Sequence, residues 1–147
     1  MASPADINPK LVDSLYGDAI DLADSLRARF ASPARDARLG DEARIALSCE
    51  GLRATARVMH CLAWLLNHRA FFSGEISEPQ LRRHGRLPSR LPASDGSALP
   101  RDAAVLVAAS ERLYDRIARL EQAWRRDPMA RRGRALERQR PRLASRA

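Results

Sequence analysis

Three charged residues on one stretch of the chain have types and a spacing that could do chemistry. Glu50, Arg53 and Arg57 follow one another at steps of three and four residues, which places them on one side of a helix. Two arginines four residues apart repel each other unless an anion lies between them, so this pair could bind a dianionic metabolite, as helical mutases do. A salt bridge from Glu50 to Arg53 on an exposed helix face explains the same pattern without a ligand.

Trp64 follows farther along the same polar side. Trp and Arg are over-represented in the hot spots of protein interfaces. We therefore predict a partner-binding face formed by Glu50, Arg53, Arg57 and Trp64 in preference to a catalytic centre. The alternative, in which Trp64 packs under a loop, stays open, as does the choice between a structural and a docking role for the two arginines.

The remaining reactive side chains do not form a recognisable motif. His60, His68, Cys49 and Cys61 lack the HExxH, CxxC and paired-histidine spacings of metal sites. The nucleophile elbow, the P-loop and the dinucleotide fingerprint are also missing. The two cysteines are twelve residues apart, which is about 18 Å along a helix and too far for a disulfide. The sequence predicts no catalytic residue, no cofactor and no metal.

Helices must position these residues, because apolar residues recur along the chain at steps of three and four. Asn8 followed by Pro9 is a favourable helix start, since Asn caps free N–H groups and Pro fits the first helical position. The apolar series that follows predicts a helix over residues 9–30: Leu11, Leu15, Ala19, Leu22, Leu26 and Phe30.

Two more helices are predicted farther along. Asp41 is a candidate cap and Gly74 a candidate stop for a long helix over residues 41–73. A third helix shows apolar steps of four and three from Leu106 onward and ends at the Asp127-Pro128 break. Residues 74–100 are rich in Pro and Gly and show neither helical nor strand periodicity, which predicts a long mobile loop.

The predicted architecture is all-α. One three-helix bundle with a long central helix occupies residues 9–127, because 147 residues suit a single domain. Residues 1–8 form a flexible N-terminus. Residues 128–147 form a disordered tail, since mutual repulsion of arginines and few apolar residues leave too little burial to offset chain entropy.

The central helix has a wide apolar arc of roughly 200°, beyond the usual stripe of a surface helix. A second copy of the chain would cover the surplus, so we predict a homodimer; the alternative is that the other two helices cover all of it. The residues of this dimer or core face are Ile45, Leu52, Met59, Leu66, Leu47, Val58, Leu65 and Phe72.

Most of the net charge of +8 lies in the tail, where seven arginines accompany the single Glu137. Such a segment could bind nucleic acid without sequence preference, and binding would weaken steeply with salt. The candidate partner-binding residues there are Arg131, Arg132, Arg134, Arg138 and Arg140. No signal peptide or membrane span is recognisable, so we expect a cytoplasmic protein with no membrane contact.

Three segments resemble one known family, the RcdA-type proteolytic adaptors, which are regulators of bacterial CtrA degradation. They are SLYGDAIDLADSLRARF, RIALSCEGLRATARVMHCLAWLLNHRAFFSGEI and LYDRIARLE, and they cover all three predicted helices. The most specific is the second, with Ser-x-Glu-x-Leu-Arg-x-Thr-x-Arg-x-Met followed by Trp-Leu-Leu and Gly-Glu-Ile.

The resemblance implies a dimeric three-helix bundle with a flexible tail and a non-enzymatic role. Proteins of this kind tether regulatory substrates of the response-regulator type to the ClpXP protease during the cell cycle. Such an adaptor works by raising the effective concentration of a substrate near the protease. The alternative, from a different class, is the nucleic-acid binder that acts through the basic tail.

Overall fold

The computed structural model describes residues 7–92 and 99–126, and this part of the chain is helical with no strand. Its elements are α1 (Pro9–Phe30), the 3-10 turn η1 (Pro33–Asp36), α2 (Asp41–Phe72), α3 (Glu78–His84) and α4 (Arg101–Arg126). The predicted all-α class is confirmed. The three predicted long helices are present, and α3 is a fourth helix that the prediction lacked.

The ends of the helices follow from local capping chemistry. The Asn8 side chain accepts a hydrogen bond from the Leu11 N–H at 2.9 Å, and Pro9 occupies the first helical position. The residue that caps the start of α2 is Gly40, not the predicted Asp41, which is the first helical residue, and no side chain caps this end. α2 ends at Phe72, after which Gly74 adopts a φ of +83° that favours glycine. Local signals of this kind explain why the predicted boundaries of α1 and α2 lie within one residue of those observed.

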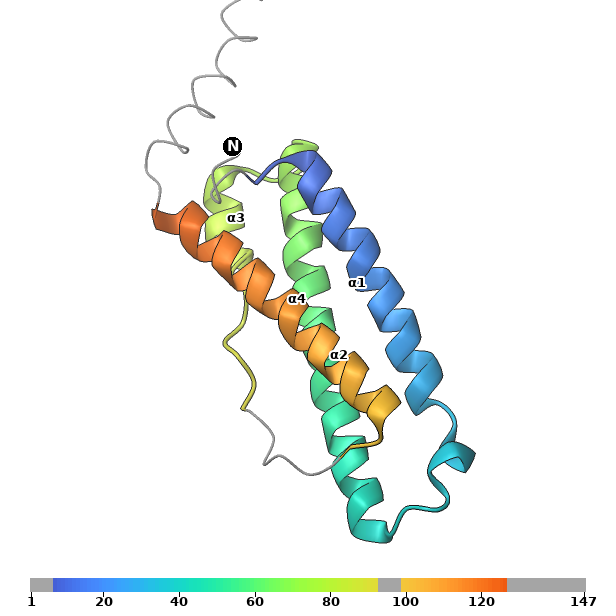
Figure 1. Ribbon diagram of the computed structural model, residues 1–147. Coiled ribbons are helices and arrows are strands. Elements are labelled where there is room, and N and C mark those ends of the chain that lie inside the picture. Colours follow the sequence, from blue (N-terminus) through green and yellow to red (C-terminus); the bar gives the residue numbers. More distant parts are fainter. Residues whose placement is uncertain (1–6, 93–98, 127–147) are drawn as a thin grey trace, which may run out of the picture.

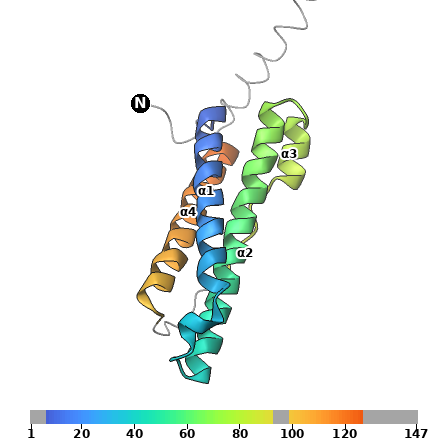
Figure 2. The same cartoon turned by 90° about the vertical axis from the view of Figure 1, so that its right-hand side faces the viewer.

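α2 is the central element, and α1 and α4 both pack along it (Figures 1 and 2). The core lies where the three helices meet: Leu15, Leu65 and Ile117 are each at most 1% exposed. The C-terminal end of α1 approaches α2 at Gly51, where a Cβ atom would lie 2.7 Å from the ring of Phe30. The core also includes Ile7, which precedes α1 and is 3% exposed.

The prediction of one long loop over residues 74–100 missed α3. The other described residues of this segment, 74–77, 85–92 and 99–100, contain no helix or strand, and residues 93–98 lie outside the described residues. α3 begins with a full capping box, in which Ser77 and Gln80 exchange side-chain and backbone hydrogen bonds. Leu81 of α3 is buried. A helix of seven residues has too few turns to show an apolar period, and tertiary packing stabilises it instead.

The next segment, residues 85–92, is an extended strap that is fixed to α4. The Leu87 N–H donates to both carboxylate oxygens of Glu121, at 3.2 and 3.0 Å, and Glu121 is only 7% exposed. The Tyr114 hydroxyl donates to the Pro88 carbonyl at 2.6 Å. Arg90 pairs with Asp115. These contacts join residues that are more than twenty positions apart in sequence, so no local sequence pattern predicts them.

Candidate functional site

The charged residues Glu50, Arg53 and Arg57 are part of the packed bundle. Glu50 and Arg57 are each 4% exposed, and Arg53 donates to Glu50 at 2.7 Å. Arg57 reaches across to α4, where it donates to the Ser110 hydroxyl at 2.8 Å and lies 3.8 Å from Glu111. The charge on each arginine is therefore met by a carboxylate of this chain.

These contacts favour a structural role for Arg57 over a role in binding a ligand. A metabolite site needs an open concavity beside the charged groups, yet Glu50 and Arg57 are buried and Arg57 contacts α4. Burying a charge is tolerated because each is paired and hydrogen-bonded. Arg57 is a structural residue that joins α2 to α4, and the geometry offers no anion site between Arg53 and Arg57.

Trp64 is a core residue, so its prediction as part of a docking face is wrong. Its side chain is 2% exposed, and its ring lies 3.8 Å from that of His68. The His68 ring in turn meets the edge of Trp124 of α4 at 5.6 Å. An interface hot spot must be reachable by a partner, and this indole is enclosed by the chain's own aromatic side chains.

The two cysteines form no disulfide with each other, as their spacing predicts, and they lie in different environments. Cys61 is fully buried, and burial raises the pKa of its thiol to about 12. Cys49 lies exposed on α2. Within residues 7–92 and 99–126, no three His, Cys, Asp or Glu side chains are grouped so that they could hold a metal ion.

The wide apolar arc of α2 divides into two faces. Leu47, Val58 and Leu65 are buried, and Phe72 packs against the core at its edge. The other four residues are exposed: Ile45 by 65%, Leu52 by 72%, Met59 by 56% and Leu66 by 48%. We call these four residues the α2 stripe. Because α1 and α4 leave it uncovered, it is the part of the predicted dimer or core face that stays available to a partner.

Two features of the molecule escaped the sequence argument. One is the strap, which Glu121 and Tyr114 hold against α4. The other is Arg29 of α1, which is 5% exposed and binds Asp36 through both terminal nitrogens at 3.1 and 2.9 Å. Its Nε lies 2.6 Å from Asp102 of α4. The Asp36 and Asp102 carboxylates raise the pKa of Arg29, and Arg29 in turn lowers the pKa of Asp102.

The five arginines predicted as a basic docking tail, Arg131, Arg132, Arg134, Arg138 and Arg140, lie outside the described residues. The nucleic-acid hypothesis depends on that segment. In the part of the chain that the structure describes, no helix is both long enough and apolar enough to span a bilayer.

Comparison with known proteins adds a relationship that these contacts alone do not supply. Residues 4–146 match the model of a family described as "Protein of unknown function (DUF1465)". The chain belongs to the DUF1465 family. Among curated proteins none matches the chain.

A solved structure extends this DUF1465 assignment. The fold is similar to the crystal structure of RcdA from Caulobacter crescentus CB15, with a TM-score of 0.66 and 26% sequence identity. The similarity covers 82% of this chain and 96% of that chain. The resemblance to RcdA-type proteins that the sequence predicted is therefore confirmed.

Proposed function

We propose that the protein is a non-enzymatic adaptor that acts in the cytoplasm and tethers response-regulator-type substrates to the ClpXP protease for cell-cycle-controlled degradation. The observation that carries this proposal is the similarity to RcdA, which covers 82% of this chain. The site geometry is consistent with it, since Glu50, Arg53 and Arg57 are occupied with one another and with α4.

Reconstituted degradation tests the proposal directly. Purified ClpXP and a panel of response regulators are incubated with and without the full chain, and substrate half-lives are measured on gels. We expect at least one regulator to be degraded several-fold faster with the chain present, because tethering raises its effective concentration. Unchanged half-lives across the panel would refute the adaptor function.

We also propose that the active form is a homodimer joined through the α2 stripe. The stripe repeats every seven residues over four heptad positions, the pattern of a helix-to-helix seam. Exposed Ser48, Thr55 and Ala63 flank it and allow close approach. Burying four half-exposed apolar side chains on each copy is a favourable use of the hydrophobic effect, and a two-fold dimer pairs the same face of both copies.

Charge favours an antiparallel pairing of the two α2 helices. A two-fold axis midway between Leu52 and Met59 places Ile45 of one copy beside Leu66 of the other. The same axis places Glu42 of one copy next to Arg69 of its partner, so that opposite charges meet; Arg69 also pairs with Asp13 of its own chain at 3.2 Å. Glu42 is exposed, and no ion pair within the described residues engages it.

Cysteine crosslinking distinguishes the two orientations. With Cys49→Ser as the background, Leu52→Cys and Met59→Cys are introduced into separate chains. An antiparallel dimer gives disulfides only when the two variants are mixed, whereas a parallel dimer crosslinks each variant with itself. Sedimentation of the double variant Leu52→Glu, Met59→Glu should show a monomer; a dimer that persists at the same concentration would contradict the proposed interface.

A further inference from the structure

A second surface is built between α1 and α4, on residues that the dimer seam does not use. The two helices run antiparallel and contact each other less than either contacts α2. A hollow with a volume of about 300 Å³ lies between them. Its floor is formed by Leu15, Leu22, Ala109 and Leu113, and its rim carries Asp18, Arg112 and Arg116.

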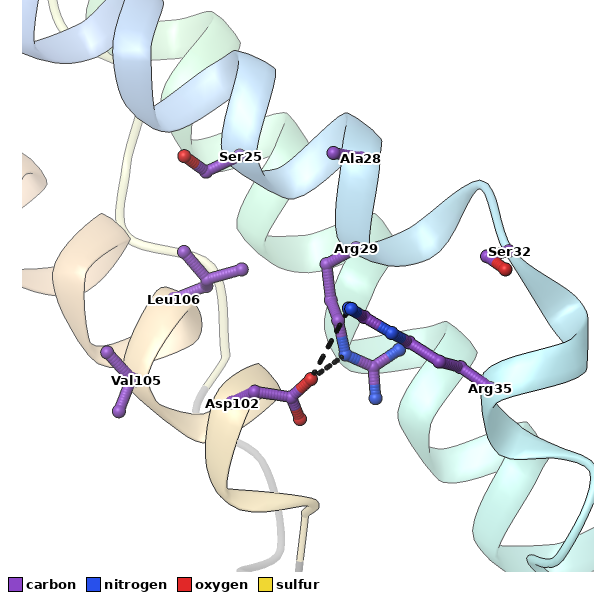
Figure 3. A pocket seen from close by; sticks show the side chains of 8 residues that line it. All are labelled: Ser25, Ala28, Arg29, Ser32, Arg35, Asp102, Val105 and Leu106. Carbon is purple, nitrogen blue, oxygen red and sulfur yellow. Dashed lines mark ion pairs between the residues drawn. The ribbon is translucent and has the colours of Figure 1, made fainter.

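A second hollow lies between the same two helices, farther toward the C-terminal end of α1, and Figure 3 shows the residues that line it. This hollow has a volume of about 550 Å³. Ser25 and Ala28 of α1 face Val105 and Leu106 of α4 across it, and the Arg29–Asp102 ion pair is part of its lining. Val105 is 57% exposed. We call the two hollows together the α1–α4 groove.

The shape of the groove suits a helix. The two hollows lie along α1 between Leu15 and Ala28, a rise of about 20 Å or almost four helical turns. The small side chains of Ser25, Ala28 and Ala109 leave room for a close neighbour. The apolar floor matches the helix-in-groove mode of recognition, in which residues at i, i+3, i+4 and i+7 enter the groove.

The charge on the rim indicates what that helix must carry. Arg112 and Arg116 are exposed and four residues apart, and neither has an ion pair within the described residues. Like charges at this spacing destabilise a helix by several tenths of a kcal/mol. Arg29 is already neutralised by Asp36 and Asp102. Arg112 and Arg116 are therefore available to pair with carboxylates of a partner.

We propose that the α1–α4 groove binds an amphipathic helix of a partner protein, with apolar residues on the accessible Leu22, Val105 and Leu106 and carboxylates paired with Arg112 and Arg116. This inference rests on the adaptor function, for which it specifies the kind of partner. A nucleic acid fits the groove less well, because its floor is apolar.

Peptide binding tests the groove without any natural partner. The probe is a fluorescent designed peptide of 21 residues with leucine at heptad spacing and glutamate on one flank; a second peptide carries lysine in place of those glutamates. Fluorescence anisotropy is measured with the wild-type chain and with two double variants. One double variant carries Arg112→Glu and Arg116→Glu, and the other carries Arg83→Glu and Arg86→Glu. The last variant makes the same charge change at exposed arginines outside the groove.

We expect the glutamate peptide to bind the wild type and the control variant equally, and the Arg112→Glu, Arg116→Glu variant at least tenfold more weakly. Ala109→Tyr fills the groove and should abolish binding. The inference would be overturned if all the variants bound the peptide with equal affinity. It would also be overturned if the peptide protected only the α2 stripe from hydrogen exchange, or if the chain bound a DNA duplex and not the peptide.

The degradation assay separates this inference from the proposed function. If Arg112→Glu, Arg116→Glu still accelerates degradation and the peptide does not bind, the groove is refuted and the adaptor function stands. If the peptide binds through the groove and no regulator is degraded faster, the groove stands and the adaptor function is refuted.

Discussion

Replacing Glu121 with alanine should detach the strap from α4. In the wild type the buried carboxylate accepts the Leu87 N–H with both oxygens and also pairs with Arg125 at 2.8 Å. The substitution leaves the Leu87 N–H without an acceptor in a place that water does not reach. An unsatisfied buried group of this kind costs about 1–3 kcal/mol. Opening the strap also exposes the Leu87 side chain, which is 8% exposed in the folded chain, and this loss of apolar burial opposes opening.

We therefore expect the strap to open locally while the three long helices stay folded. A loss of about 2 kcal/mol corresponds to a roughly thirtyfold larger open fraction. Hydrogen exchange followed by NMR measures this at the Leu87 amide, with amides in the middle of α1 as the internal control. Glu121→Gln is the matched variant, since its side-chain oxygen can still accept one hydrogen bond, and it should give a smaller increase. Equal exchange of Leu87 in the wild type and in Glu121→Ala would refute the reasoning.

Two further predictions concern titrating groups. A thiol reagent at pH 8 should modify one cysteine per native chain, Cys49, and two after unfolding, because Cys61 is buried with a pKa raised to about 12; two reactive thiols in the native chain would contradict this. The pKa of Asp102 is lowered by Arg29, so its stabilising contribution is complete above its unfolded pKa of about 3.9 and is lost as the pH falls through the folded pKa. Asp102→Asn should flatten the fall in urea midpoint below about pH 4, and an unchanged pH profile would show that the ion pair does not contribute.

Local chemistry explains how much of the fold the sequence could predict. The start of α1 depends on Asn8 and Pro9, which are adjacent, and its boundaries were predicted correctly. The capping box of α3 is also written in the sequence at Ser77 and Gln80, but the helix is too short to add an apolar period. The strap depends on Glu121, which is 34 residues from the backbone group it binds, and no local pattern connects the two.

The candidate site was harder to predict because exposure is a tertiary property. Glu50, Arg57 and Trp64 lie on the polar side of α2, and the polar side of an amphipathic helix at a protein surface normally faces solvent. That side meets α4 instead, and Ser110 supplies the partner that allows Arg57 to be buried. The width of the apolar arc was visible in the sequence, yet only the positions of α1 and α4 decide that Leu65 is core and Leu52 is surface.

The aromatic cluster at the end of α4 has a mechanical consequence. Trp124 lies in the last turn of the helix, 3% exposed, with the guanidinium groups of Arg82 and Arg125 each 5.5 Å from its ring. A force applied to the C-terminal end of α4 must pull this buried indole away from both guanidinium groups before the rest of the helix can unwind. The last turn of α4 is therefore anchored to the bundle, whereas a helix end without such an anchor frays.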